Sequence, residues 1–426
     1  MISALIIVLF MLFMFARVPV SIALALATIL AMLAGGYDLM TLPQKMAASV
    51  QSIELMAIPF FILAASLMNA LGLTRQIFAF ATAVVGHLRG GLAHANVVAG
   101  MIFSGISGAA VADAAALGAI SMKEMPKAGY ARPFAAATVI AVATLGPIIP
   151  PSIMMVIYAV IANVSIAKLF IAGIMPGLMI GALLMLLIWF LGRAGYAAYP
   201  PPEPFRWRAL AIASRRAVFA LLAPVVILRG MAAGWTTPTE AGVLAVFYAL
   251  AVGAMQRTLS FAKVRHCLRE TVEASSLIMF IIAVSTALSW VVVAEGTAGQ
   301  FAGLVSEYAR SALVFLLVSN LFLLILGAVI ETLPAMLIAL PILLPAAKAL
   351  GVDLVHFGVV VIFNLVVGIM TPPMGIGLFI LAAIGKLGMG ELVRASVPFL
   401  LLLLVALALL TVFPQISLFL PQLLWP

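Results

Sequence analysis

Long apolar runs separated by short polar connections make up most of this chain. They begin with residues 2–34, where only Arg17 and Pro19 interrupt the pattern, and continue through a long stretch at 92–192 that carries only a few charges. The other apolar runs cover residues 52–73, 74–86, 217–233, 239–256, 271–294, 311–330, 332–350, 356–385 and 392–425. None alternates with the period of a strand, which argues against a β-barrel. At about 20 residues per crossing, the pattern predicts an all-α polytopic membrane protein with on the order of a dozen helices.

The first run is too long for one straight crossing. As a single helix, residues 2–34 would extend about 50 Å, whereas the hydrocarbon core of a bilayer is ~30 Å thick. We therefore expect a break or a tilt at Arg17 and Pro19. The first 16 residues have neither a basic leader nor a small-residue cleavage site, so we interpret them as a retained helix rather than a signal peptide.

Composition supports a membrane location and excludes several classes of function. Hydrophobic residues make up 66% of the chain and charged residues 8%, against about 25% charged residues in a soluble domain. Much of the net charge of +9 comes from the connections at 193–216 and 257–269, which the positive-inside rule places in the cytoplasm. No basic face remains, so nucleic acid is not an expected partner. Cys267 has no partner for an intrachain disulfide, and the four scattered histidines do not suggest a metal site.

The chain contains an internal repeat. A shift of 222 residues aligns glycines and prolines of the two halves without a gap: Gly105 with Gly327, Gly129 with Gly351, Gly146 with Gly368, Pro150 and Pro151 with Pro372 and Pro373, and Pro176 with Pro398. Duplicated, Gly/Pro-interrupted apolar segments are typical of secondary transporters. The identities do not give the relative orientation of the halves; an inverted topology is the arrangement we expect of such a transporter.

Each half has two irregular segments that are candidates for a binding site. In the first half these are 103–108 and 146–152, and in the second half 331–334 and 364–375. Proline breaks a helix and exposes backbone carbonyls, which are tolerated at membrane depth only beside protein or a water-filled cavity. Carbonyl, hydroxyl and amide oxygens suit Na⁺, and helix N-termini suit a carboxylate. The alternative is that these segments are kinks that serve helix packing.

Five motifs together resemble a known family. They are Gly-Gly-Leu-Ala-His-Ala-Asn at 90–96, Ser-Gly-x-x-Val-Ala-Asp-Ala-Ala at 107–115, Gly-Pro-x-Ile-Pro-Pro-Ser at 146–152, Thr-Pro-Thr-Glu-Ala at 237–241 and Asn-x-x-x-Gly-x-x-Thr-Pro-Pro-x-Gly at 364–375. In this order they resemble the large membrane subunit (M subunit) of tripartite ATP-independent periplasmic (TRAP) transporters of the C4-dicarboxylate and sialic acid type, within the ion transporter superfamily. The resemblance covers essentially the whole chain.

The resemblance implies an elevator-type transporter with two re-entrant hairpins and two broken helices. Hairpin one would cover about 97–125 and hairpin two about 319–349, with broken helices at about 131–162 and 356–385. The implied domains are N-terminal scaffold helices at 1–92, a first transport-domain repeat at 93–192, a basic loop with scaffold or arm helices at 193–270, a scaffold helix and connection at 271–310, a second transport-domain repeat at 311–390 and a C-terminal helix at 391–426.

The resemblance also implies site residues. A first sodium site would use Ser107, Gly108, Thr144 and Gly146, and a second Thr332, Asn364, Gly368 and Thr371. The substrate path between the hairpin tips would include Ser104, Asp113, Pro150, Ser152, Glu331, Pro373 and Gly375. The family usually reads Ser-Gly-Ser in hairpin one, whereas this chain has Ala109 at the third position, so the first cation site would lack one hydroxyl.

Isolated charges in apolar segments are functional candidates because they are costly in the bilayer. Asp113 is expected either near the cation or substrate path or as a solvated carboxylate that stabilises the hairpin, and Glu331 has the same two readings. Glu54 and Glu273 are interpreted as helix-start carboxylates, and Thr237 with Glu240 as a capping box. Lys123 and Arg132 are interpreted as interface anchors rather than substrate ligands.

The expected function is sodium-gradient-driven uptake of a small organic anion across a bacterial inner membrane. Na⁺ would be the coupling ion, with no other cofactor, and no catalytic activity is expected. The implied partners are the lipid bilayer, a small four-helix membrane subunit (Q subunit) and a periplasmic substrate-binding protein (P subunit). The chain has no phosphate-binding Gly-x-x-x-x-Gly-Lys-Ser/Thr loop. Two alternatives remain open: an intramembrane serine protease using Gly-Ile-Ser-Gly at 105–108 with His356 as base, and a passive channel.

Overall fold

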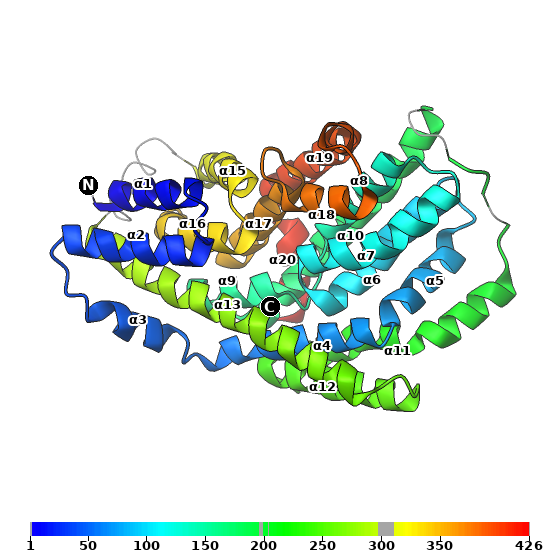
Figure 1. Ribbon diagram of the computed structural model, residues 1–426, viewed down its shortest axis with the longest axis horizontal. Helices are drawn as coiled ribbons and strands as arrows, with labels where there is room; N and C mark the ends of the chain where they lie inside the picture. Colours follow the sequence, from blue (N-terminus) through cyan, green and yellow to red (C-terminus); the bar gives the residue numbers. More distant parts are fainter. Residues whose placement is uncertain (1, 196–198, 203, 297–310, 426) are drawn as a thin grey trace.

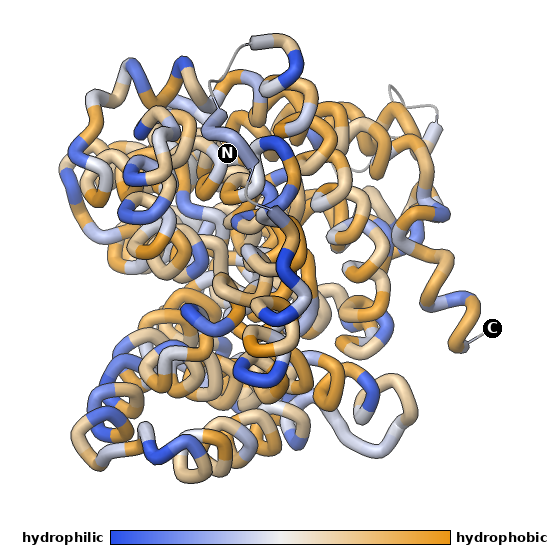
Figure 2. The backbone as a smooth tube through the Cα atoms, turned by 90° about the vertical axis from the view of Figure 1, so that its right-hand side faces the viewer, coloured by the Kyte–Doolittle hydropathy of each residue, from blue (hydrophilic) through white to orange (hydrophobic). Residues whose placement is uncertain are grey.

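The computed structural model describes residues 2–195, 199–202, 204–296 and 311–425, and all regular secondary structure within these ranges is helical. Eight of the helices are long and apolar enough to cross a membrane. Hydrophobic residues cover most of the helices (Figure 2), and large apolar side chains such as Leu321 and Phe247 are more than half exposed. Such faces suit a lipid solvent rather than water. The chain is therefore a multi-pass helical membrane protein, as predicted.

Helices from two separate parts of the chain form one side of the molecule. These are α1 (Ile2–Phe15), α2 (Val20–Ala34), α3 (Thr41–Ser49), η1 (Ile53–Met56), α4 (Ala57–Ala70), α5 (Leu73–Val85), α11 (Trp207–Ala232), α12 (Pro238–Met255) and α13 (Phe261–Ala294). The long helix α13 runs along α2, α3 and α4, while α12 packs on α4 and α11 packs on α5 (Figure 1). The predicted break at Arg17 and Pro19 is confirmed, because α1 ends at Phe15 and α2 begins directly after Pro19.

The remaining helices come in two matching series. The first is α6 (Gly91–Ser107), α7 (Ala110–Lys127), α8 (Arg132–Ala143), α9 (Ile153–Ala162) and α10 (Ile166–Arg193). The second is α15 (Ala312–Val329), α16 (Thr332–Ala349), α17 (Leu354–Val367) with η2 (Gly368–Met370), α18 (Ile376–Gly385) and α19 (Met389–Val412), followed by α20 (Gln415–Leu424). Helices α7 and α16 begin 222 residues apart, as do α8 and α17. The helix boundaries thus repeat with the same spacing as the glycines and prolines.

The first parts of the two interrupted helices form the centre of the core. Every residue from Phe134 to Ala143 in α8 and from His356 to Val367 in α17 is buried. A helix that is apolar on all sides is stable only when other helices surround it. The two series also interlock, since α18 packs on α7 and α8 while α9 packs on α16 and α17. The segments that follow α8 and α17 therefore lie inside the protein rather than in lipid.

The predicted hairpins and broken helices correspond to pairs of observed helices. The range 97–125 falls on α6 and α7, 319–349 on α15 and α16, 131–162 on α8 and α9, and 356–385 on α17 and α18. The domain limit placed after residue 92 falls inside α6, and the limit placed after residue 270 falls inside α13. Residues 297–310 of the predicted 271–310 domain lie outside the described residues. The division into scaffold and transport domains stays a prediction.

The basic connections are shorter than the sequence suggested, and the interpretation of Glu273 is wrong. Helix α13 begins at Phe261, where the Ser260 Oγ accepts a hydrogen bond from the Lys263 N–H at 3.3 Å. Glu273 lies well inside this helix and pairs with Arg269 one turn earlier, with 2.8 Å between Nε and Oε1. Charged residues mark the end of an apolar run in the sequence. Lys, Arg and Glu are nevertheless good helix formers, so the helix extends beyond the apolar run. In the same way α11 already begins at Trp207 within the segment 193–216.

Two helix starts that the sequence predicted are confirmed by the structure. Thr237 and Glu240 form the predicted capping box at the start of α12, with 2.7 Å between the Thr237 N and the Glu240 Oε2. Glu54 lies in the first turn of η1 and accepts a hydrogen bond from the Ser52 hydroxyl. Both carboxylates therefore have a structural explanation.

Candidate functional site

The tip of the first hairpin, between α6 and α7, packs directly against the segment that joins α8 to α9. Gly108 has a φ of +63°, and a Cβ placed on it would lie 2.6 Å from the Pro151 carbonyl oxygen and 3.1 Å from the Ser152 Cα. Only glycine combines a left-handed conformation with so close an approach of two backbones. The motif Ser-Gly at 107–108 therefore closes the hairpin and joins it to Pro150, Pro151 and Ser152.

Asp113 forms the centre of a buried oxygen cluster at this tip. It lies in the first turn of α7, where the helix dipole favours a carboxylate. The Ser107 hydroxyl donates to its Oδ1, and the Ser104 hydroxyl donates to its Oδ2 at 3.1 Å. Asp113 has no exposed surface, so its reading as a solvated carboxylate is wrong. Among the described residues it forms no ion pair.

Gly146 completes this cluster from the unwound segment. A Cβ at Gly146 would lie 2.5 Å from the Asp113 Oδ2 and 3.2 Å from the backbone nitrogen of Ala110. Thr144 is buried next to it, but its hydroxyl donates to the Ala141 carbonyl at 2.6 Å. Ser152 caps α9, where its hydroxyl accepts from the Met155 N–H at 3.3 Å. The structure thus brings together seven predicted residues around one point: Ser104, Ser107, Gly108, Asp113, Gly146, Pro150 and Ser152.

An ionised carboxylate in this position needs a positive partner. Removing a carboxylate from water without a countercharge costs several kcal/mol. Two serine hydroxyls and the helix N-terminus offset only part of that cost, because they contribute dipoles rather than a full charge. A small cation with oxygen ligands fits the chemistry of this cluster.

The second hairpin contacts its own unwound segment through two glycines. A Cβ on Gly368 would lie 2.6 Å from the carbonyl carbon of Gly327 and 2.9 Å from its Cα. The Met374 N–H donates to the Ala328 carbonyl at 3.1 Å, which ties the unwound segment to the end of α15. The buried Asn364 lies one helical turn before Gly368. The second half therefore repeats the contact between a hairpin and a helix break.

Of the other predicted residues of the second half, Gly375 is buried, and the rest occupy less enclosed positions. The Thr371 hydroxyl donates to the Val367 carbonyl at 3.0 Å. A Cβ on Gly375 would lie 3.0 Å from the backbone carbonyl oxygen of Thr371. Glu331 and Pro373 are exposed, and Thr332 is half-buried at the start of α16. The prolines of the first half, Pro150 and Pro151, are buried, so the two halves expose their breaks to different degrees. Both proline pairs contain a cis peptide bond.

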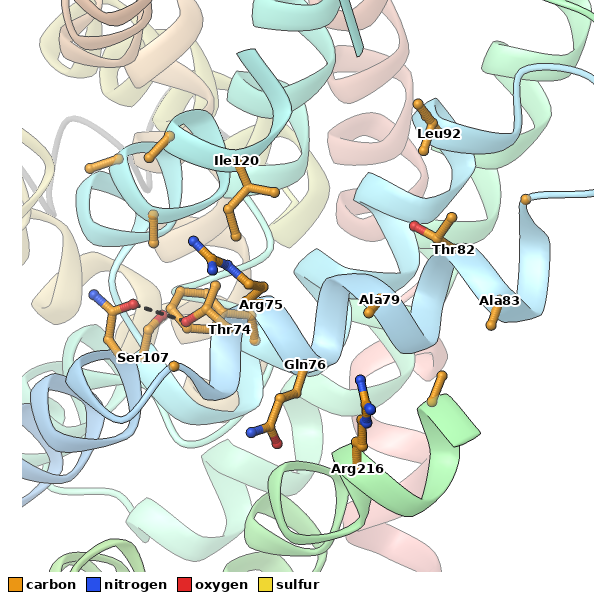
Figure 3. A pocket seen from close by; sticks show the side chains of 18 of the residues that line it. Thr74, Arg75, Gln76, Ala79, Thr82, Ala83, Leu92, Ser107, Ile120 and Arg216 are labelled. Atoms are coloured by element: carbon orange, nitrogen blue, oxygen red, sulfur yellow. Dashed lines mark hydrogen bonds between the residues drawn. The ribbon is translucent and has the colours of Figure 1, made fainter. Parts of the chain in front are cut away.

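A cavity of about 1830 Å³ lies between the first hairpin and the helices α4, α5, α11 and α13. Ser107 and Ala109 from the hairpin tip line it, so the position at which the resemblance led us to expect a second serine faces this space. Figure 3 shows Arg75 and Gln76 on α5 and Arg216 on α11, which line this cavity together with Ser107. The basic residues that line the cavity are Arg75, Arg206, Arg216 and Lys263, and Glu270 is its carboxylate. The charge of this lining favours an anion.

Sequence reasoning missed these cavity residues. Arg75 lies near the start of the short apolar run 74–86, where it resembled an ordinary interface anchor. Arg206 and Arg216 lie in the basic segment that the sequence assigned to a connection. Among the described residues that line the cavity, neither Lys123 nor Arg132 occurs. Only the packing of α5 and α11 around the hairpin identifies the basic residues that face one space.

The hydrogen bonds do not favour a serine protease. Ser107 donates to Asp113, whereas the His356 Nδ1 lies 2.7 Å from the Ser417 Oγ at the start of α20. Asp353 caps α17 three residues before His356. Within the part of the chain that the structure describes, Ser107 has no histidine among its hydrogen-bond partners. A nucleophilic serine needs such a base.

Comparisons with known proteins agree with the helical architecture and the motifs. A family model described as "Tripartite ATP-independent periplasmic transporter, DctM component" matches residues 7–416. The chain is 38% identical over 385 residues to the sialic acid TRAP transporter large permease protein SiaM of Vibrio cholerae, with 89% of each chain covered. It is 38% identical over 380 residues to the C4-dicarboxylate TRAP transporter large permease protein DctM of Pseudomonas aeruginosa, covering 89% of this chain and 88% of the relative.

One solved structure resembles the fold at much lower sequence identity. The YdaH transporter of Alcanivorax borkumensis superposes with a TM-score of 0.60 at 15% identity, covering 87% of this chain and 86% of that chain. At this identity the likeness concerns the fold alone.

Proposed function

We propose that this chain, which belongs to the DctM component family of tripartite ATP-independent periplasmic transporters, couples the entry of Na⁺ to the uptake of a small organic anion. The observation that carries this proposal is the buried oxygen cluster at the tip of hairpin one, which the buried Asn364 beside the helix break matches in the second half. Asp113 with Ser104, Ser107 and Gly146 would hold one cation, and Asn364 with Gly368 and neighbouring oxygens would hold the other. Unwound backbone at membrane depth is a common location for coupling-ion sites.

The cavity supports an anionic substrate. Four basic side chains and one carboxylate line the space that begins at the tip of hairpin one. The relatives are named for sialic acid and for C4-dicarboxylates, which both carry carboxylate groups. We propose an anion of this class as substrate, with its carboxylate drawn toward Arg75 and Arg216.

The proposed movement is an elevator in which α6–α10 and α15–α19 slide against the remaining helices. The buried breaks of the two series interlock through α7, α8, α9, α16, α17 and α18, which favours their moving as one body. The halves would have inverted topology, with the two hairpins re-entrant from opposite sides. A small membrane subunit would pack on the scaffold in the bacterial inner membrane, and a periplasmic binding protein would deliver the substrate.

Uptake into proteoliposomes tests this function. The chain would be reconstituted with its small membrane subunit and its binding protein, and labelled sialic acid and succinate would be offered in parallel. We expect accumulation of one of them only under an inward sodium gradient. Equal accumulation with potassium in place of sodium would contradict the coupling, and equilibration without accumulation would favour a channel.

The basic lining gives a second prediction. We expect Arg216→Gln to lower the initial uptake rate at subsaturating substrate about fivefold, the size of effect typical of one partly exposed charge pair. The neighbouring Arg215→Gln is the matched control, because Arg215 is also exposed on α11 but does not line the cavity. Equal rates for the two variants would remove Arg216 from the substrate path.

A further inference from the structure

Three buried polar side chains form a hydrogen-bonded relay across the helices α19, α15 and α17. The Asn320 Nδ2 donates to the Thr411 Oγ1 at 2.8 Å. The Asn364 Nδ2 donates to the Asn320 Oδ1 at 2.9 Å and to the Asn320 backbone oxygen at 3.0 Å. Thr411 is 1% exposed, Asn320 7% and Asn364 0%. This relay runs from α19 to the last turn of α17, beside its break.

The direction of the relay is fixed at Thr411. Its hydroxyl carries one proton, which it donates to the Leu407 carbonyl at 2.7 Å. Thr411 can therefore only accept from Asn320, so the NH₂ group of Asn320 must point toward it and the Asn320 Oδ1 must point toward Asn364. The Asn320 backbone oxygen is an acceptor in either orientation, so both Asn320 atoms that contact the Asn364 amide are acceptors. The Asn364 NH₂ group must face them, and its Oδ1 must face away.

The Asn364 Oδ1 is left as an acceptor without a protein donor. It is buried and has no hydrogen-bond partner among the described residues. Leaving a buried acceptor unpaired is unfavourable, and a bound ion is one explanation for such an atom in a native structure. A carbonyl oxygen of this kind is a hard ligand of the type that Na⁺ prefers.

We propose that Asn320 and Thr411 are positioning residues that aim the Asn364 Oδ1 at the second sodium ion. This inference rests on the second cation site of the proposed function. Neither residue touches the ion. Thr411 fixes the orientation of the Asn320 amide, and the Asn320 oxygens in turn hold the NH₂ group of Asn364. The Asn364 Oδ1 therefore already faces the ion site when no ion is bound. Preorganisation of a ligand in this way increases affinity because less orientation is lost on binding.

The relay belongs to one half only. At the 222-residue spacing, Asn320, Asn364 and Thr411 correspond to Val98, Val142 and Trp189, none of which can form such a relay. The first half instead places the carboxylate of Asp113 where the second half has Ala335. The two cation sites therefore differ in chemistry, and a change in the relay should affect only the second.

Equilibrium sodium binding to the purified full-length chain tests the relay. Binding of ²²Na⁺ and the sodium-induced rise in Tm, with choline as the reference cation, would be measured for Thr411→Val, Thr411→Ser and Asn320→Ala, with Asn364→Ala as the variant that removes the ligand itself. We expect Thr411→Val and Asn320→Ala to raise the sodium Kd of one class of site about tenfold, an effect of the size of one net hydrogen bond. Thr411→Ser, which keeps the hydroxyl, should remain within about twofold of wild type.

Thr28→Val is the matched control. Thr28 is also fully buried and donates to the carbonyl one turn earlier, at 2.8 Å from the Leu24 oxygen, but it accepts no hydrogen bond from an asparagine. Its replacement should lower Tm in choline and leave the sodium Kd unchanged. The relay is wrong if Thr411→Val and Asn320→Ala fold and bind sodium as wild type does while Asn364→Ala loses a site. That result would leave the proposed cation site intact. If wild type shows no sodium binding, the proposed function fails and the relay with it.

Discussion

Replacement of Asp113 by Asn is expected to reduce sodium-driven uptake by on the order of 100-fold or more. The change keeps the shape of the side chain but removes the only full negative charge of the first oxygen cluster, and it directs NH₂ donors toward the space that a cation would occupy. Loss of one member of a buried charge pair typically costs about 3–5 kcal/mol. Initial uptake rates into proteoliposomes, measured over a range of sodium concentrations, would report the loss.

Asp353→Asn serves as the control for this variant. Asp353 is exposed and caps α17, where its Oδ1 accepts from the backbone N–H groups of Val355 and His356. Asn is an equally good cap, so this variant should transport as wild type does. Uptake by Asp113→Asn with wild-type rate and sodium dependence would show that the buried carboxylate is no cation ligand.

The second large effect is expected for Gly108→Ala, which should abolish uptake. A Cβ at Gly108 would approach the Pro151 carbonyl oxygen to 2.6 Å and the Ile153 nitrogen to 3.2 Å. Because both neighbours are backbone atoms, neither can rotate away as a side chain can. The hairpin tip would have to move from the unwound segment, and the oxygens around Asp113 would separate. The uptake assay and the sodium-induced rise in Tm should both lose their response.

Gly351→Ala separates this packing effect from backbone strain. Gly351 has nearly the same conformation, with a φ of +67° against +63° for Gly108, but a Cβ there would meet no atom within 4 Å. Both substitutions place alanine in the left-handed region, at a cost of roughly 1 kcal/mol. Gly351→Ala should therefore lower stability slightly and keep transport. Equal loss of transport in both variants would attribute the effect to strain, not to contact between the hairpin and the break.

Local signals predicted much of the fold. Glycine at 108 and proline at 150, 151, 372 and 373 act on their own backbone, so the breaks they cause can be located from the sequence. The capping box at Thr237 is local in the same sense. The constant spacing of these residues predicted the second series of helices from the first, and the structure agrees at α7 and α16 and at α8 and α17.

Contacts between distant residues could not be predicted in this way. Nothing near Asn320 indicates that Thr411, 91 residues later, accepts its hydrogen bond, and nothing near Arg75 indicates that it shares a cavity with Arg216. The interpretation of Glu273 was wrong for a related reason. A change of polarity at the edge of an apolar run was mistaken for the start of a helix. Burial of Asp113 also depends on tertiary packing, which is why the sequence left a solvated alternative open.

The central claim is that the two breaks bind cations through the oxygens gathered around them. High-resolution electron cryo-microscopy maps of the protein purified in sodium chloride and in choline chloride test this claim directly. The account predicts sodium-dependent density beside the Asp113 carboxylate and beside the Asn364 Oδ1, absent in choline. Identical maps with neither density, at a resolution that shows ordered waters elsewhere in the protein, would contradict it.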